Sequence, residues 1–141
     1  MHNDASQSAV LGYDAGMDPS TVLLLVAAGL VVAAWFVVRR LTLIPLGQAR
    51  ELLARGAAVI DVRSPAEFDA GHVPHAINLP LDTLTERIQA VVNDKEAPLL
   101  LHCLSGGRSA LAQRRLRRLG YTQVHNLGSL DRAQSLAEMS H

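Results

Sequence analysis

Cysteine, aromatic residues and net charge are scarce in this sequence of 141 residues. It contains one Cys, two Phe, two Tyr and one Trp, so an internal disulfide is excluded and a core must use Leu, Val, Ile and Ala. Its 13 basic and 13 acidic residues cancel, so bulk charge indicates neither a nucleic acid nor an acidic partner. The six His are scattered without zinc-ligand spacing to a second Cys, and we expect no metal and no cofactor.

Lys and Arg are absent from the first 38 residues, which carry a net charge of −3 from three Asp. Residues 19–38 contain no charged side chain. Twenty helical residues extend about 30 Å, which matches the hydrocarbon thickness of a bilayer. Trp35 and Phe36 lie near one end of this segment, where interfacial aromatic residues are common. We therefore predict a transmembrane helix over residues 19–38, after a short polar tail over residues 1–18.

Two alternatives concern how this segment is used. A cleaved signal peptide normally begins with basic residues, whereas the residues before this segment contain acids and no base. Arg39 and Arg40 follow the segment directly, and basic flanks favour the cytoplasmic side. We expect a single-pass protein of the inner (cell) membrane with its N-terminus outside and its C-terminal domain cytoplasmic. A periplasmic domain is the alternative orientation.

The rest of the sequence predicts an α/β domain with a mainly parallel sheet flanked by helices. Short apolar runs alternate with short helical patterns, and Ser64, Pro65 and Glu67 form a capping-box pattern at one helix start. The predicted strands are residues 57–61, 76–79, 98–102 and 124–126. The predicted helices are residues 47–55, 64–68, 82–92, 109–119 and 130–138.

One loop carries the pattern typical of a reactive thiol. The apolar run 98–102 predicts a buried strand that places Cys103 at the carboxyl edge of the sheet. Gly106 and Gly107 let the backbone turn its N–H groups inward, and the following helix presents its positive end to the same hollow. Arg108 adds a permanent positive charge. Such surroundings lower the pKa of a thiol, so we predict that Cys103 is a nucleophile rather than an inert buried residue.

Four segments resemble the signatures of rhodanese domains and stand in the same order. Residues 60–68 and 71–80 resemble the two N-terminal signatures, and residues 103–109 and 120–124 resemble the catalytic loop and the strand after it. The loop pattern Cys-x-x-Gly-x-Arg is most similar to that of the small phage-shock-type thiosulfate sulfurtransferases. The resemblance implies a rhodanese-like fold over residues 46–141, joined to the transmembrane helix by a junction at residues 39–45.

The resemblance also implies a mechanism and a set of site residues. Catalytic Cys103 would take a sulfane sulfur from thiosulfate or a similar donor, form a persulfide, and pass the sulfur to cyanide or a thiol, including a protein thiol. The donor and persulfide would be bound by the loop residues Leu104, Ser105, Gly106, Gly107 and Arg108. Asp61, Arg63 and Ser109 would support the loop, the first two by hydrogen bonds to it.

Two other functions stay open at this point. A cysteine phosphatase or arsenate reductase also uses His-Cys and an Arg, but its loop places five residues between Cys and Arg, whereas this chain has four between Cys103 and Arg108. The shorter loop favours a single sulfur atom over a phosphate. The second alternative is a membrane-tethered persulfide carrier or docking module with little turnover, which requires the same loop.

Overall fold

The computed structural model describes residues 18–140, without the side chains of residues 39–41, and its contacts divide the chain into two units, residues 1–37 and 38–141. The predicted polar tail over residues 1–18 lies outside the described residues except for Asp18. The side chains of Arg39 and Arg40, on which the predicted orientation depends, also lie outside them. Each unit is described by itself below.

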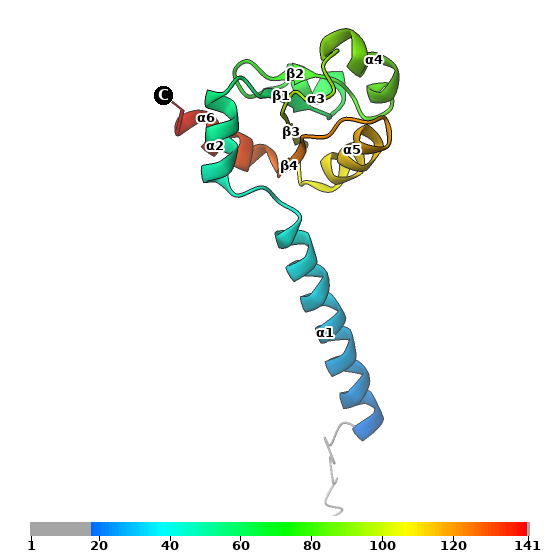
Figure 1. Ribbon diagram of the computed structural model, residues 1–141. Helices are drawn as coiled ribbons and strands as arrows, with labels where there is room; N and C mark the ends of the chain where they lie inside the picture. The colour runs from blue at the N-terminus through cyan, green and yellow to red at the C-terminus, as the bar shows by residue number, and fades with distance from the viewer. Residues whose placement is uncertain (1–17, 141) are drawn as a thin grey trace, which may run out of the picture. The chain divides into compact units, whose positions relative to one another are not determined.

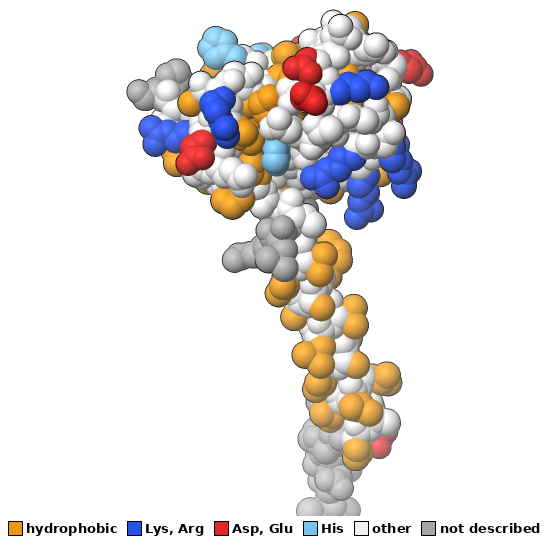
Figure 2. All heavy atoms as spheres, viewed as in Figure 1, with side chains coloured by type: hydrophobic (Ala, Val, Ile, Leu, Met, Phe, Trp, Pro, Cys, Tyr) orange, Lys and Arg blue, Asp and Glu red, His pale blue; other side chains and the backbone are white. Residues whose placement is uncertain are grey.

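The first unit contains the apolar helix. Helix α1 spans Pro19–Leu41, so it continues three residues beyond the predicted end at residue 38. Apolar side chains cover its visible face, and none of the stretch Pro19–Val38 is buried (Figure 2). This stretch is long and apolar enough to cross a membrane, and a signal sequence near an N-terminus meets the same conditions.

The second unit is built on a parallel sheet, as predicted. In the described part of the chain the sheet has four strands in the order β2-β1-β3-β4, and each neighbouring pair is parallel. Strand β3 is central and buried along its whole length, which explains its continuous apolar sequence. The strands are β1 (Ala58–Asp61), β2 (Ile77–Asn78), β3 (Leu99–His102) and β4 (Val124–Gly128).

Helices cover both faces of this sheet (Figure 1). Leu101 packs in one core cluster with Leu84 of α4 and Leu116 of α5. Leu100, its neighbour in β3, packs in a second cluster with residues of α2 and α6, because successive side chains of a strand point to opposite faces. The helices of this unit are α2 (Leu46–Ala54), α3 (Pro65–Asp69), α4 (Leu84–Val91), α5 (Gly107–Arg118) and α6 (Leu130–Glu138).

Most predicted elements are confirmed within one or two residues, and α6 has the predicted bounds. The predicted start of the fourth helix at Ser109 is wrong, because α5 begins at Gly107. Gly106 takes a φ of 97° and acts as the N-cap of this helix. A residue with a Cβ rarely adopts this conformation, so the glycine allows a tighter connection than we predicted. Arg108 and Ser109 therefore lie in the first turn of α5.

Candidate active site around Cys103

Cys103 follows the last residue of β3 and lies at the carboxyl edge of the sheet. Its backbone N–H donates to Gly128 O at 3.0 Å, and Val62 N donates to the preceding residue, His102, at its carbonyl oxygen, also at 3.0 Å. Between Leu101 and His102 the pairing with β4 shifts by one residue, so Gly128 rather than Leu127 lies opposite His102. The Cys103 side chain belongs to the core cluster with α4 and α5 and is 1% exposed. Hydrogen bonds from the ends of the two neighbouring strands, β1 and β4, thus fix the backbone at Cys103.

Backbone N–H groups of the loop converge on the Cys103 sulfur. Gly106 N donates to Cys103 Sγ at 3.0 Å. Burial by itself raises the pKa of this thiol, but hydrogen bonds from Ser109, Gly106 and Ser105 outweigh it, so the pKa is lowered. Ser105 and Gly106 of the predicted loop are thus among the donors to the sulfur, together with Ser109, which we predicted as a support of the loop and which lies in the first turn of α5.

The exposed part of the loop is tied to the start of α6. Leu130 N donates to Leu104 O at 3.3 Å, and Ser105 forms an antiparallel bridge with Ser129. Leu104 is nonetheless 56% exposed, and Gly107 is exposed as well. The loop therefore presents an apolar side chain to the surface beside a buried sulfur.

Arg108 forms an ion pair that the sequence analysis missed. Its Nη1 and Nη2 donate to Glu67 Oε2 and Oε1, each at 2.7 Å. Glu67 is also the N3 residue of the predicted capping box, which is confirmed: Ser64 N donates to Glu67 Oε2, and Glu67 N donates to Ser64 Oγ. Hydrogen bonds from Arg108 lower the pKa of Glu67, and Glu67 raises the pKa of Arg108, which also interacts with the Cys103 sulfur. The capping-box pattern identified Glu67 but not its partner.

Asp61 and Arg63 form a buried pair at the end of β1. Arg63 Nη2 donates to Asp61 Oδ2 at 2.6 Å, and both side chains are at most 4% exposed. Arg63 Nη2 also donates to Gly71 O at 2.9 Å. We predicted that this pair would brace the Cys103 loop by hydrogen bonds, but the bonds just described instead tie β1 to the end of the α3 segment. The pair reaches the loop indirectly, because Asp61 lies 3.7 Å from His102, the residue before Cys103.

His102 lies next to this pair and is fully buried. Its Nε2 lies 3.7 Å from Asp61 Oδ2. Among the described residues, this nitrogen is the buried side-chain polar atom without a hydrogen-bond partner. Burial lowers the pKa of His102, so its imidazole is neutral at pH 7. Leu101 and Cys103 share one core cluster while His102 points to the other face, which argues against a role as a base for the thiol.

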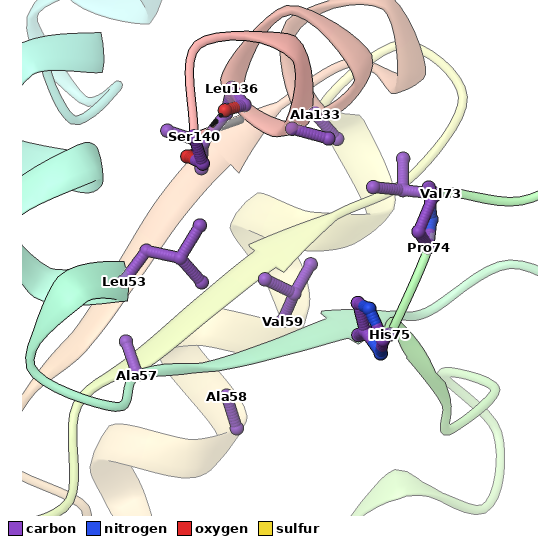
Figure 3. Close-up of a pocket in the computed structure, with 11 residues that line it drawn as sticks. Leu53, Ala57, Ala58, Val59, Val73, Pro74, His75, Ala133, Leu136 and Ser140 are labelled. Atoms are coloured by element: carbon purple, nitrogen blue, oxygen red, sulfur yellow. Dashed lines mark hydrogen bonds between the residues drawn. The ribbon is translucent and has the colours of Figure 1, made fainter.

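Other features of the second unit lie apart from this site. In the part of the chain that the structure describes, no group of three His, Cys, Asp or Glu is placed to hold a metal ion. A cavity of about 350 Å³ is lined mainly by apolar side chains, among them Leu53 of α2, Val59 of β1 and Leu136 of α6 (Figure 3). The described site residues are not among those that line this cavity.

Comparisons with known proteins agree with this geometry. The model of the rhodanese-like domain matches residues 46–132. The chain is 42% identical over 71 residues to thiosulfate sulfurtransferase PspE of Escherichia coli, covering 50% of this chain and 68% of PspE. It is 35% identical over 80 residues to thiosulfate sulfurtransferase GlpE of Ectopseudomonas mendocina, covering 57% of this chain and 72% of GlpE.

A solved structure supports the same match at the level of the fold. The structure titled rhodanese with anions from E. coli superposes with a TM-score of 0.53 and 39% identity, covering 55% of this chain and 91% of that one. The matched family region begins at Leu46, after α1, and therefore lies in the second unit.

Proposed function

Because this chain belongs to the rhodanese-like family, we propose that it is a thiosulfate sulfurtransferase that works through a persulfide on Cys103. The observation that carries the proposal is the hydrogen bond from Gly106 N to Cys103 Sγ at 3.0 Å, within a loop that lowers the pKa of the thiol. A thiolate is the nucleophilic form of cysteine, so this loop prepares the sulfur for attack without a separate base.

In the first half-reaction the Cys103 thiolate attacks the outer sulfur of thiosulfate. A new S–S bond forms, the bond between the two sulfurs of thiosulfate breaks, and sulfite leaves with its electron pair. The resulting persulfide keeps the single negative charge of the thiolate. The N–H groups that act on the thiol, those of Ser105, Gly106 and Ser109, are placed to stabilise this anion.

In the second half-reaction an acceptor takes the outer sulfur of the persulfide. Cyanide or a thiolate attacks that sulfur, the S–S bond to Cys103 breaks, and Cys103 leaves as a thiolate. The products are thiocyanate or a new persulfide, and the enzyme returns to its first state. The loop stabilises the leaving thiolate by the same hydrogen bonds that it gives to the attacking one, so one set of donors serves both steps.

Arg108 supplies the positive charge for binding the donor. Its side chain is 38% exposed and interacts with the Cys103 sulfur, so it can contact an anion that approaches this sulfur. A guanidinium binds a sulfonate through two parallel hydrogen bonds, as it binds a carboxylate. In the described structure Glu67 occupies those donors, so thiosulfate competes with Glu67 for Arg108.

The test is replacement of Cys103 by Ser, with the formation of thiocyanate from thiosulfate and cyanide as the assay. We expect loss of activity with an unchanged melting temperature and circular dichroism spectrum. The wild type incubated with thiosulfate should gain about 32 Da on Cys103, the mass of one sulfur atom added in covalent catalysis. A Cys103→Ser variant with wild-type rates contradicts the mechanism.

The exposed Leu104 favours a second candidate, a persulfide carrier that serves a protein thiol. Leu104 is 56% exposed next to the buried sulfur, and burial of this apolar side chain against a protein partner would be favourable. A carrier forms the persulfide on Cys103 but turns over cyanide slowly. The carrier is supported if Cys103 gains the sulfur adduct but thiocyanate forms at a steady-state rate near the uncatalysed level. The enzyme is supported if thiocyanate forms rapidly.

We also propose that α1 anchors this domain in the inner membrane, with the N-terminus outside and the domain in the cytoplasm. The proposed organisation is a polar tail over residues 1–18, a span over 19–38, a junction over 39–45 and the rhodanese domain over 46–141. Support comes from the length and apolar composition of Pro19–Val38 and from the two arginines that follow it.

Extraction of membranes with alkaline carbonate tests the anchor. We expect the protein to stay in the membrane pellet with an intact mass that includes residues 1–38. A soluble protein that has lost these residues identifies a cleaved signal sequence instead. A protease added to intact spheroplasts should spare the domain, and its digestion from outside indicates the opposite orientation.

A further inference from the structure

Ser109 has one hydroxyl proton and four acceptors within reach. Its Oγ lies 2.7 Å from Asn126 Oδ1, 3.1 Å from Gly106 O, 3.4 Å from Gly128 O and 3.7 Å from Cys103 Sγ. A hydroxyl donates one hydrogen bond at a time. The distance to Asn126 is the usual one for an O–H donor, and the sulfur is a weak acceptor while it is a neutral thiol. The proton of Ser109 is therefore held by Asn126 in this structure.

The two backbone carbonyls are weaker competitors for this proton. Gly106 O already accepts from Ala110 N at 3.2 Å, and Gly128 O accepts from Cys103 N at 3.0 Å. Water does not replace any of these acceptors, because Cys103, Ser109 and Asn126 are 1%, 0% and 2% exposed. Asn126 and the sulfur thus compete for one proton in a buried setting, where hydrogen bonds to an anion are strong.

We propose that Asn126 is a positioning residue that sets how much of the Ser109 hydrogen bond reaches Cys103. While the sulfur is a neutral thiol, the hydroxyl donates to Asn126 Oδ1. When the sulfur becomes a thiolate, rotation of the hydroxyl transfers its hydrogen bond to the anion, and Asn126 Oδ1 loses the hydrogen bond that it accepted. Asn126 acts through Ser109 and not by touching the sulfur. The proposal rests on the proposed role of Cys103, and it adds a residue that no motif of the loop contains.

Other groups that act on the thiol stay in place in the variants proposed below. Hydrogen bonds from backbone N–H groups lower the pKa of Cys103 independently of Asn126. Charged and titratable side chains on the elements around the sulfur include Arg108 of α5, Glu67 of α3, Asp61 of β1 with Arg63 after it, His102 of β3, His125 of β4 and Arg132 of α6. Arg108 is the member of this set that interacts with the sulfur itself, and Arg132 donates to Leu127 O and Ile44 O.

The experiment measures the rate at which iodoacetamide alkylates Cys103 as a function of pH. The chain has one cysteine, so the increase in mass reports this residue alone. We expect Asn126→Leu, which removes the acceptor at similar volume, to lower the midpoint of the profile by about one pH unit, the effect of one hydrogen bond to a charged group. We expect Ser109→Ala to raise the midpoint. If the Leu side chain of Asn126→Leu prevents folding, Asn126→Ala serves as the second variant.

The double variant separates positioning from a general disturbance of the site. In a Ser109→Ala background, Asn126→Leu should leave the midpoint unchanged, because the hydroxyl through which it acts is gone. An unchanged or raised midpoint in Asn126→Leu alone overturns the proposal, and so does an equal decrease in both backgrounds. Alkylation needs neither thiosulfate nor an acceptor, so the result stands even where the proposed sulfur transfer fails its own test.

Discussion

Glu67 and Arg108 are 41 positions apart in sequence and form two parallel hydrogen bonds of 2.7 Å. The contact joins the first turn of α3 to the first turn of α5. Glu67 Oε2 also accepts from Ser64 N at 3.0 Å, so one carboxylate both caps α3 and orients the guanidinium beside Cys103. The position of the proposed anion-binding side chain therefore depends on a helix that contributes no residue to the loop.

Replacement of Glu67 by Gln should increase the affinity for thiosulfate. Gln serves in a capping box as Glu does, so α3 is preserved while the negative charge that competes for Arg108 is removed. We expect the KM for thiosulfate at low ionic strength to fall about threefold, the effect of a partly exposed ion pair. The difference should shrink at high salt, where such charges are screened. A KM that rises, or that changes equally at all salt concentrations, contradicts competition between Glu67 and the donor.

Replacement of Gly106 by Ala should destabilise the loop, whereas the same change at Gly107 should not. Gly106 has a φ of 97°, a conformation that costs an L-residue about 1–2 kcal/mol, and its N–H donates to Cys103 Sγ. Gly107 lies in the first turn of α5, and a Cβ added to it would meet open space. Denaturant titration measures the free energy of unfolding of both variants, and the pH profile of alkylation reports the thiol. Equal effects of the two substitutions contradict this interpretation.

The local parts of this structure were predictable from the sequence, and the contacts between distant segments were not. The capping box at Ser64 is encoded within four residues, and α6 has the predicted bounds because its pattern is continuous. The start of α5 was placed two residues late, because a pair of glycines does not reveal which of them adopts a positive φ. Only the fold brings Arg108 to Glu67.

The contact of Ser109 with Asn126 shows the same limit. Asn126 stands in β4 between His125 and Leu127, and in the sequence its amide is not distinguished from any other buried polar group. Its role follows from the pairing of β4 with β3 and from the 2.7 Å contact across 17 positions. A buried Asn in a strand next to the predicted catalytic strand was the available signal, and it did not identify the partner.

Replacement of Asp61 by Asn should destabilise the domain strongly. Asp61 is fully buried and Arg63 is 3% exposed, so the variant leaves a buried guanidinium without its counterion. We expect a loss of about 3 kcal/mol in the free energy of unfolding. The exposed Asp69→Asn is the matched control, with a change below about 0.5 kcal/mol. The double variant Asp61→Asn with Arg63→Met should lose less free energy of unfolding than the sum of the losses in the two single variants. If the two losses simply add, the broken ion pair is not the cause of the destabilisation.

His102 should make the domain less stable in mild acid. Burial lowers its pKa, so between the folded-state pKa and the ordinary value near 6.5 the unfolded chain binds more protons than the folded one. Stability is therefore complete above the ordinary value and decreases as the pH falls below it. Replacement by Phe should reduce the decrease in melting temperature between pH 7.5 and pH 5.5, values that bracket the ordinary pKa of His. His125, whose pKa burial also lowers, accounts for part of the remaining slope.

The burial of the single cysteine also determines how the protein responds to oxidants. Peroxide converts a thiolate to a sulfenic acid, which many redox proteins protect by forming a disulfide with a neighbouring cysteine. This chain has one cysteine, 1% exposed, so an oxidised Cys103 finds no resolving thiol within its own chain. Repair must therefore come from a reductant outside the chain that can reach this buried sulfur. The burial that shields Cys103 from oxidants thus also limits which reductants can restore it.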